Sequence, residues 1–204
     1  MKIIIISGPS GSGKTTLSNK LLLKLKKSFI LNTDNYYRCG LRSNLLSKLI
    51  YSYFDKIISF NRQRFIKDLT YILNNKNIES YYKYDFVKRN LNKEFCRVKN
   101  IKYLIIEGIF GFDISDLLEM DKVVFVELKS NKEICKKRII KRDSITRGKL
   151  KMTAQKEFMN AWRIYYKKRV DIDFSKLFKN YLIFITDPNI EIILNKLDKM
   201  FDYC

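Results

Sequence analysis

A glycine-rich segment near the start of the chain has the residue types needed to hold a phosphate group. It reads Gly8-Pro9-Ser10-Gly11-Ser12-Gly13-Lys14-Thr15-Thr16 and contains the pattern G-x-x-x-x-G-K-T. Glycines let successive backbone N–H groups turn toward one phosphate, and a helix that begins there adds positive potential. Lys14 can reach the terminal phosphates, and the hydroxyl of Thr15 can ligate Mg²⁺. We therefore predict that this phosphate loop (residues 8–16) binds ATP.

Two carboxylates stand where phosphoryl transfer to an alcohol needs them. That reaction requires a group that takes the hydroxyl proton and a Mg²⁺ ion near the phosphates. The chain has no histidine, so we expect the base to be a carboxylate. We assign that role to Asp34, which follows a short apolar segment, and we expect Glu107 and Thr15 to hold Mg²⁺ and its waters. Taken singly, Asp34 could equally be a helix cap and Glu107 a strand-end carboxylate paired with a surface lysine.

Three arginines could supply the positive charge that the transferred group requires. Arg138, Arg142 and Arg147 lie on and around a predicted turn over residues 143–148. We interpret residues 138–152 as a lid that closes over the phosphates. The alternative is a solvated basic face, which is a strong competitor in so basic a chain.

Five apolar runs predict the strands that position these groups. They cover residues 3–6, 28–32, 102–106, 122–127 and 181–185, and helical patterns lie between them. Such an alternation predicts an α/β fold with a parallel sheet covered on both faces. Ligands bind at the carboxyl edge of such a sheet, so Gly8, Asp34 and Glu107 should meet in one site.

The rest of the chain reads as one domain over residues 1–204 with an insertion over about residues 38–100. The insertion is predicted to be mostly helical to Asn77, to continue as a strand over residues 79–86 and to end in a surface loop over residues 87–99. The helix after the fourth core strand is expected over residues 132–142, and the next one over residues 153–168. The loop over residues 186–189 is a candidate contact for the adenine ring.

Composition limits the classes of partner. There are 41 basic and 21 acidic residues, which gives a net charge of +20. This charge could attract nucleic acid or an anionic membrane, but the lysines are scattered and form no basic run, so we expect neither partner. No apolar stretch approaches the length of a membrane-spanning helix. The four cysteines are far apart and form no C-x-x-C motif, which favours reduced thiols and a cytoplasmic location.

In order and spacing, these segments resemble the uridine kinase and phosphoribulokinase family of P-loop kinases, most closely its uridine kinase branch. Beyond the phosphate loop, the matching motifs are Thr33-Asp34-Asn35-Tyr36-Tyr37, Phe54-Asp55, Tyr84-Asp85-Phe86, Ile106-Glu107-Gly108 and Arg142-Asp143-x-x-x-Arg147-Gly148. Each motif is short and unspecific by itself. Their shared order over most of the chain carries the resemblance.

The resemblance implies a three-layer α/β/α P-loop NTPase fold with a mostly parallel five-stranded sheet, a small helical and β insertion and a lid. It implies a kinase that uses ATP and Mg²⁺ to phosphorylate the 5′-hydroxyl of uridine or cytidine. On this basis Asp55 would hold the ribose, and Tyr84 and Phe86 would pack against the pyrimidine. Arg138 would join the phosphate loop in binding ATP, while Lys14, Arg142 and Arg147 would act on the transferred group. The family often forms tetramers, which leaves a homo-oligomer open.

Departures from the family pattern gather on the acceptor side. Lys56-Ile57 stands in place of a His-Pro pair, Arg89 falls near the position of a base-reading histidine, and Glu157 replaces a glutamine. A glutamate only accepts hydrogen bonds, whereas a glutamine also donates them. We expect Arg89 and Glu157 to lie on the substrate side, where they could form a pair. We also keep open another acceptor such as nicotinamide riboside, a degenerate kinase that only binds ATP, and a nucleic-acid-binding ATPase suggested by the charge.

Overall fold

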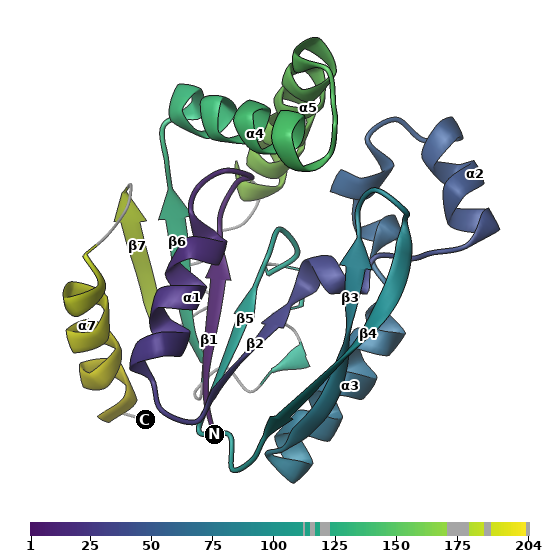
Figure 1. Cartoon of the computed structure of the whole chain (residues 1–204). Coiled ribbons are helices and arrows are strands. Elements are labelled where there is room, and N and C mark those ends of the chain that lie inside the picture. The colour runs from purple at the N-terminus through teal and green to yellow at the C-terminus, as the bar shows by residue number, and fades with distance from the viewer. Residues whose placement is uncertain (112, 115–116, 119–122, 171–179, 186–188, 203–204) are drawn as a thin grey trace.

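A parallel sheet of five strands forms the centre of the molecule. The computed structural model describes residues 1–111, 113–114, 117–118, 123–170, 180–185 and 189–202 (Figure 1). The strand order is β2-β5-β1-β6-β7, and every neighbouring pair is parallel. These strands are β1 (Lys2–Ser7), β2 (Ser28–Asn32), β5 (Tyr103–Glu107), β6 (Val123–Lys129) and β7 (Tyr181–Ile185). The predicted α/β fold and its five core strands are confirmed.

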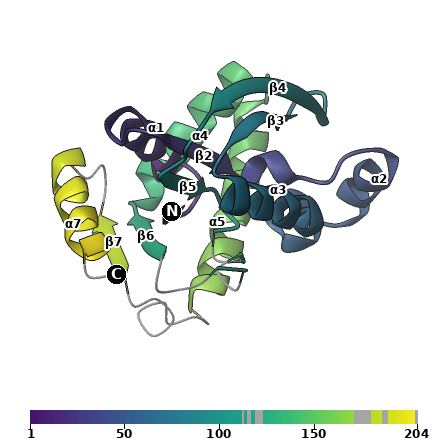
Figure 2. The ribbon, with the colours of Figure 1, turned by 90° about the horizontal axis from the view of Figure 1, so that it is seen from below.

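Alternating isoleucines in β1 build the core on both faces of the sheet. Ile3 and Ile5 join a buried cluster with α3 (Arg62–Asn75), and Ile4 and Ile6 join a second one with α1 (Lys14–Lys24) and α7 (Ile190–Asp202). Figure 2 shows α1 and α7 on one side of the sheet and α3 on the other. Because side chains in a strand point alternately to opposite faces, an unbroken apolar run is what a sheet covered on both sides requires.

The insertion consists of helices, short 3₁₀ turns and a hairpin. Its elements are α2 (Leu41–Leu49), η2 (Tyr53–Asp55), η3 (Ile57–Ser59), α3, β3 (Ile78–Asp85) and β4 (Asn90–Val98). The prediction of a surface loop over residues 87–99 was wrong, because β4 pairs with β3 as an antiparallel strand. Its sequence is polar because much of the hairpin is exposed to solvent. Only Leu91, Cys96 and Val98 of β4 pack against the core.

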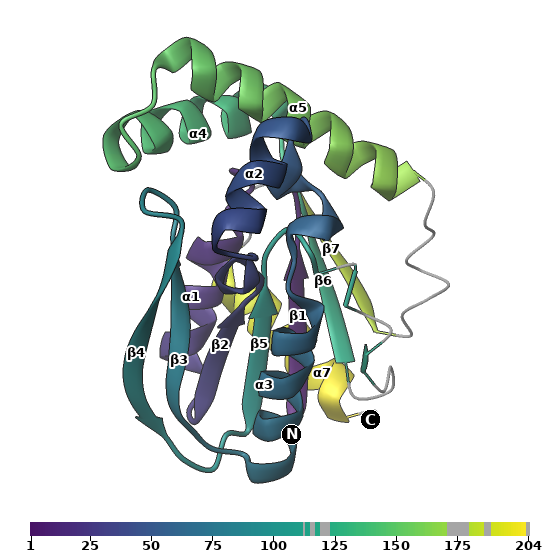
Figure 3. The ribbon, with the colours of Figure 1, turned by 90° about the vertical axis from the view of Figure 1, so that its right-hand side faces the viewer.

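Two helices, α4 (Lys132–Thr146) and α5 (Lys151–Val170), lie above the carboxyl edge of the sheet (Figure 3). The first of these helices is capped by Asn131, whose side chain accepts a hydrogen bond of 2.8 Å from the Glu133 amide. It continues to Thr146, so the predicted helix end at Arg142 and the turn over residues 143–148 were wrong. Gly148, with φ 61°, lies in the short connection between the two helices. Among the helices described, none combines the length and apolar character needed to span a bilayer.

Candidate active site

The phosphate loop connects β1 to α1 and is held in a conformation that only glycine permits at two positions. Gly11 has φ 84°, and a Cβ there would lie 2.7 Å from the carbonyl oxygen of Cys135 in α4. Gly13, with φ 97°, caps α1 in the left-handed region. Lys14 is buried, and its Nζ donates to the carbonyl oxygens of Gly8 and Pro9 at 3.0 Å each. The loop therefore wraps tightly around the Lys14 ammonium, beside the first turn of α1.

Glu107 ends β5 at the same edge of the sheet. The Thr15 hydroxyl donates to its Oε1 at 3.2 Å, and the Asn32 amide donates to the same oxygen. The pKa of Glu107 is raised to about 7, first by burial and then by the nearby negative charge of Asp34, against the opposing effect of Lys14. A single carboxylate thus connects the start of α1 with the ends of two strands.

Asp34 lies in η1 (Thr33–Tyr36), immediately after β2. Its backbone N–H donates to Asn32 Oδ1 at 2.7 Å, so Asn32 caps this turn. Gly108 has φ 140°, and a Cβ there would lie 1.9 Å from Thr33 Oγ1 and 3.4 Å from Asp34 Oδ1. The chain after β5 therefore passes directly against Asp34, as only a glycine allows. Burial raises the pKa of Asp34, and the positive charges of Lys14, Arg142 and Arg147 oppose that shift.

Several buried oxygens at this edge have no hydrogen-bond partner in the part of the chain that the structure describes. They include Asp34 Oδ1, Ser12 Oγ and Thr33 Oγ1. Buried polar atoms without partners are uncommon and call for an explanation, and a bound polar ligand is one. Together with the Thr15 hydroxyl and Glu107, this oxygen-rich set fits Mg²⁺, which binds through one or two carboxylates plus substrate phosphates. No three His, Cys, Asp or Glu side chains form a potential metal site in the described part of the chain, so a metal held entirely by such side chains does not fit there.

The carboxylate of Asp143 forms ion pairs with three basic side chains of the predicted lid. This carboxylate is 4 % exposed and accepts from Arg142 Nε at 2.8 Å and from Arg147 Nη1 at 3.5 Å. Lys149 Nζ lies 3.8 Å from the same carboxylate. Arg138 Nη1 donates to the Gly11 carbonyl at 3.4 Å, which attaches α4 to the phosphate loop. The arginines predicted from the sequence therefore do lie around the phosphate loop and Asp34.

Aromatic rings line the acceptor side next to Asp34. Tyr37 is buried, and its ring centroid lies 5.6 Å from Phe54, 5.2 Å from Tyr84 and 5.8 Å from Phe86. The Arg147 guanidinium lies 4.0 Å from the centroid of the Phe86 ring, a cation–π contact. Tyr37 belongs to the motif Thr33–Tyr37 noted in the sequence, where its ring was a candidate for stacking on a base. Burial first, and then the charges of Asp34 and Asp55, raise the pKa of Tyr37 well above its ordinary value.

The acceptor-side charges are arranged differently from the pair that the sequence suggested. Glu157 forms an ion pair with Lys149, while Arg89 Nη1 donates to Ser47 Oγ at 3.0 Å and its guanidinium lies 5.3 Å from the Phe54 ring. The charges of Glu157, Lys149 and Asp34 all act on the carboxylate of Asp55. The pKa of Asp55 is raised to about 7, first by burial and then by the negative charge of Glu157, while the positive charge of Lys149 opposes the shift. Asp55 and Glu157 therefore interact, whereas Arg89 contacts α2 and Phe54.

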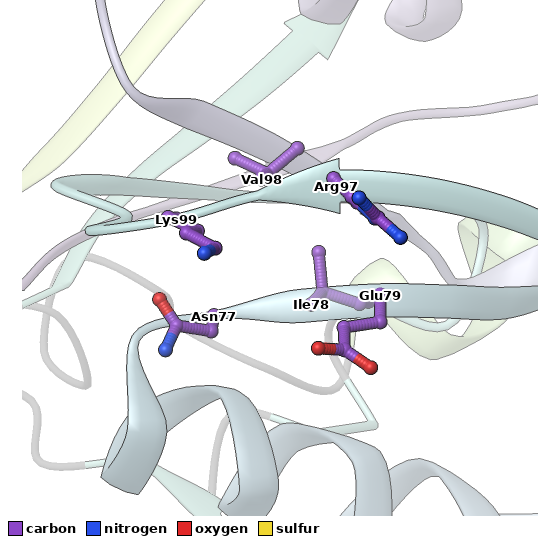
Figure 4. Close-up of a pocket in the computed structure, with 6 residues that line it drawn as sticks. All are labelled: Asn77, Ile78, Glu79, Arg97, Val98 and Lys99. Atoms are coloured by element: carbon purple, nitrogen blue, oxygen red, sulfur yellow. The ribbon is translucent and has the colours of Figure 1, made fainter.

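A separate hollow lies at the base of the β3–β4 hairpin. Figure 4 shows its lining residues, which are Asn77, Ile78, Glu79, Arg97, Val98 and Lys99. Its volume of about 130 Å³ is below the roughly 300–1,000 Å³ of small-molecule sites. It lies at the opposite end of the hairpin from Tyr84 and Asp85, so it plays no part in the site at the carboxyl edge.

Known proteins resemble this chain over most of its length. The sequence pattern of the phosphoribulokinase/uridine kinase family matches residues 3–176. The uridine kinase of Limosilactobacillus reuteri is 32% identical over 150 residues, which is 72% of this chain and 67% of that protein. The uridine kinase of Staphylococcus epidermidis is 27% identical over 172 residues, covering 83% of this chain and 81% of its own.

Solved structures share the fold at much lower identity. YFH7 from Saccharomyces cerevisiae, a candidate P-loop kinase with a circular permutation, has a TM-score of 0.65 at 10% identity and covers 92% of this chain and 93% of its own. A candidate fructose transport system kinase from Silicibacter sp. TM1040 has a TM-score of 0.61 at 20% identity, covering 80% of this chain and 84% of its own. At these identities the likeness concerns the fold alone.

Proposed function

The chain belongs to the phosphoribulokinase/uridine kinase family of kinases, and on that basis we propose that it transfers the γ-phosphoryl group of ATP to the 5′-hydroxyl of uridine or cytidine. One observation carries this proposal. Asp34 presents a buried carboxylate oxygen that has no hydrogen-bond partner among the residues described, and the positive charges of Lys14, Arg142 and Arg147 act on this carboxylate. A carboxylate in that position suits the removal of a proton from an alcohol next to a transferable phosphate.

On the donor side, we assign the phosphates of ATP to the loop. Backbone N–H groups from Gly11 to Thr15 would hold the β-phosphate, and Lys14 would exchange its two carbonyl partners for phosphate oxygens. Thr15 and Glu107 would hold Mg²⁺, which neutralises negative charge on the phosphates when it is bound. Arg142 and Arg147 would stabilise the charge on the group in transfer, with Arg138 attaching α4 to the loop.

On the acceptor side, we assign the ribose hydroxyls to Asp55 and the base to the rings of Tyr84 and Phe86. The aromatic contacts around Tyr37 support a flat ring as ligand, since offset and edge-to-face stacking favour one. Arg89 and Glu157 lie on the margin of this region and would influence which base is accepted. A cytoplasmic location agrees with the free thiols of Cys39, Cys96 and Cys135.

The direct test is Asp34→Asn, which keeps the shape of the side chain but removes its ability to take a proton. We expect kcat with uridine to fall by about 10²–10⁴-fold, because general base catalysis contributes that much. The affinity for Mg·ATP, measured by calorimetry, should change by less than about threefold.

The matched control is Asp198→Asn on the exposed face of α7, across the sheet from the acceptor site, which should behave as the wild type. Equal kcat values for Asp34→Asn and the wild type would refute the assignment of Asp34 as the base.

A further inference from the structure

The connection between α4 and α5 is fixed by one buried residue. The Asp143 carbonyl accepts from the backbone N–H groups of Arg147 at 3.2 Å and Lys149 at 3.1 Å. Its carboxylate binds the side chains of Arg142 and Arg147 and lies 3.8 Å from Lys149 Nζ. Backbone and side chain of Asp143 together therefore determine where the Lys149 ammonium lies.

Lys149 faces a second group of carboxylates on its other side. It forms an ion pair with Glu157, which lies in the second turn of α5. Helix α5 contacts η2, the turn that contains Asp55. The groups that act on the Asp55 carboxylate are Glu157 and Lys149 from the α4–α5 side and Asp34 from η1. The charges of both aspartates also act on the buried Tyr37 and raise its pKa, after burial as the first cause.

Charged side chains thus form a series from the lid to Glu157, in which positive and negative groups alternate, and the series ends at a second carboxylate, Asp55. Arg147 pairs with Asp143, Asp143 with Lys149, and Lys149 with Glu157, whose charge acts on Asp55. Lys149 is the one member of this series that contacts carboxylates of both parts. Its side chain is 30 % exposed, which leaves it partly desolvated and able to act more strongly than a surface lysine.

We propose that Lys149 is a positioning residue that joins the lid to the acceptor site, because it lies against Asp143 on one side and on the other pairs with Glu157, in the helix that contacts the turn of Asp55. The inference deepens the proposed function and rests on it only in treating Asp55 as a residue that binds the acceptor. Closure of the lid and a negatively charged Asp55, ready to accept hydrogen bonds from hydroxyls, would then depend on the same ammonium group.

The first test needs no substrate. Carboxyl-labelled aspartate allows the titration of Asp55 to be followed by ¹³C NMR, with Asp55→Asn to assign the signal. In Lys149→Met we expect the midpoint to rise by about one pH unit, since loss of a nearby positive charge disfavours the carboxylate. Lys149→Arg should keep the wild-type midpoint. The double variant Lys149→Met with Glu157→Gln should return to that value or fall below it, because the repelling charge is gone as well. An unchanged midpoint in Lys149→Met, or no return in the double variant, overturns the inference.

The second test separates this role from simple damage to the lid. With uridine at pH 7, Lys149→Met should raise KM by about fivefold, because a one-unit rise leaves far less of Asp55 ionised. At pH 9 the KM values of variant and wild type should converge. An increase in KM that is the same at both pH values would contradict the inference and indicate a structural defect. A wild-type protein that phosphorylates no acceptor would refute the proposed function, and the NMR titration would still decide the role of Lys149.

Discussion

At the scale of single residues, the site concentrates carboxylates in places where burial disfavours their charge. Asp34, Asp55 and Glu107 all have raised pKa values, and burial is the first cause for each. Such groups lower the stability of the free protein, and they cluster where ligands supply compensating charge. The positive charges of Lys14 and the lid arginines only partly offset this cost.

A substitution at Glu107 measures how much a buried carboxylate lowers the free energy of unfolding. The pKa of Glu107 is about 7 in the folded protein and lower when unfolded, so the folded state binds the extra proton. Its charge therefore destabilises the fold fully above pH 7, and the penalty declines as the pH falls toward the ordinary value of 4.5. We expect Glu107→Gln to raise the free energy of unfolding of the ligand-free protein by about 1–3 kcal/mol at pH 8. Most of that gain should be lost at pH 5. Urea titrations at the two pH values measure both numbers.

The exposed Glu191, which pairs with Lys24 on the surface, provides the control. Glu191→Gln should change the free energy of unfolding by less than about 0.5 kcal/mol at either pH. If Glu107→Gln had the same effect at pH 8 and pH 5, the account of Glu107 as a buried, disfavoured charge would be wrong.

At the scale of elements, α5 extends from the lid to the sheet, and an ion pair in its last turn attaches it to β6. Arg169 Nε donates to Glu127 Oε1 at 2.7 Å and Nη2 donates to Oε2 at 3.1 Å. Glu127 lies in β6 and is almost fully buried. The Tyr181 hydroxyl of β7 donates to the same carboxylate. This bidentate pair therefore determines the position of the helix that carries Glu157.

We predict that Arg169→Met lowers the free energy of unfolding by about 3–5 kcal/mol, because removing one partner leaves a buried charge uncompensated. Lys167→Met in the same turn, at an exposed position, should change it by less than about 0.5 kcal/mol. Denaturant unfolding of the two variants decides the matter. Similar small effects in both would show that the Glu127 pair contributes little to holding α5.

The elements also show what a sequence can and cannot predict. The isoleucine run of β1 and the phosphate loop were readable because each depends on neighbours in sequence. The strand β4 was missed because a hairpin exposed on one side needs few apolar residues. The proposed role of Lys149 could not be predicted from its neighbours in sequence, because the connection between α4 and α5 brings its two carboxylate partners, Asp143 and Glu157, to it. In α2 the leucines at 41, 45 and 49 follow a helical pattern, yet all three are exposed.

At the scale of the whole molecule, the net charge of +20 and the groups at the site would act on ligands in different ways. A basic surface attracts any polyanion without selectivity. The site instead brings together particular groups, because Asp34, Glu107 and the phosphate loop follow or end three strands that meet at one edge of the sheet. Electrostatic attraction of ATP is one consequence of the charge that agrees with a kinase.

We propose that this edge of the sheet transfers a phosphoryl group to a nucleoside hydroxyl. The most direct measurement is ADP release from Mg·ATP with uridine, cytidine, nicotinamide riboside or ribulose 5-phosphate as acceptor, beside a polynucleotide and a reaction without acceptor. We predict acceptor-dependent release with uridine and cytidine that exceeds the release without acceptor by at least about a hundredfold. Release with another acceptor alone would contradict the assigned substrate. Release stimulated only by polynucleotide, or none despite tight binding of ATP, would contradict the account of the site as a nucleoside kinase.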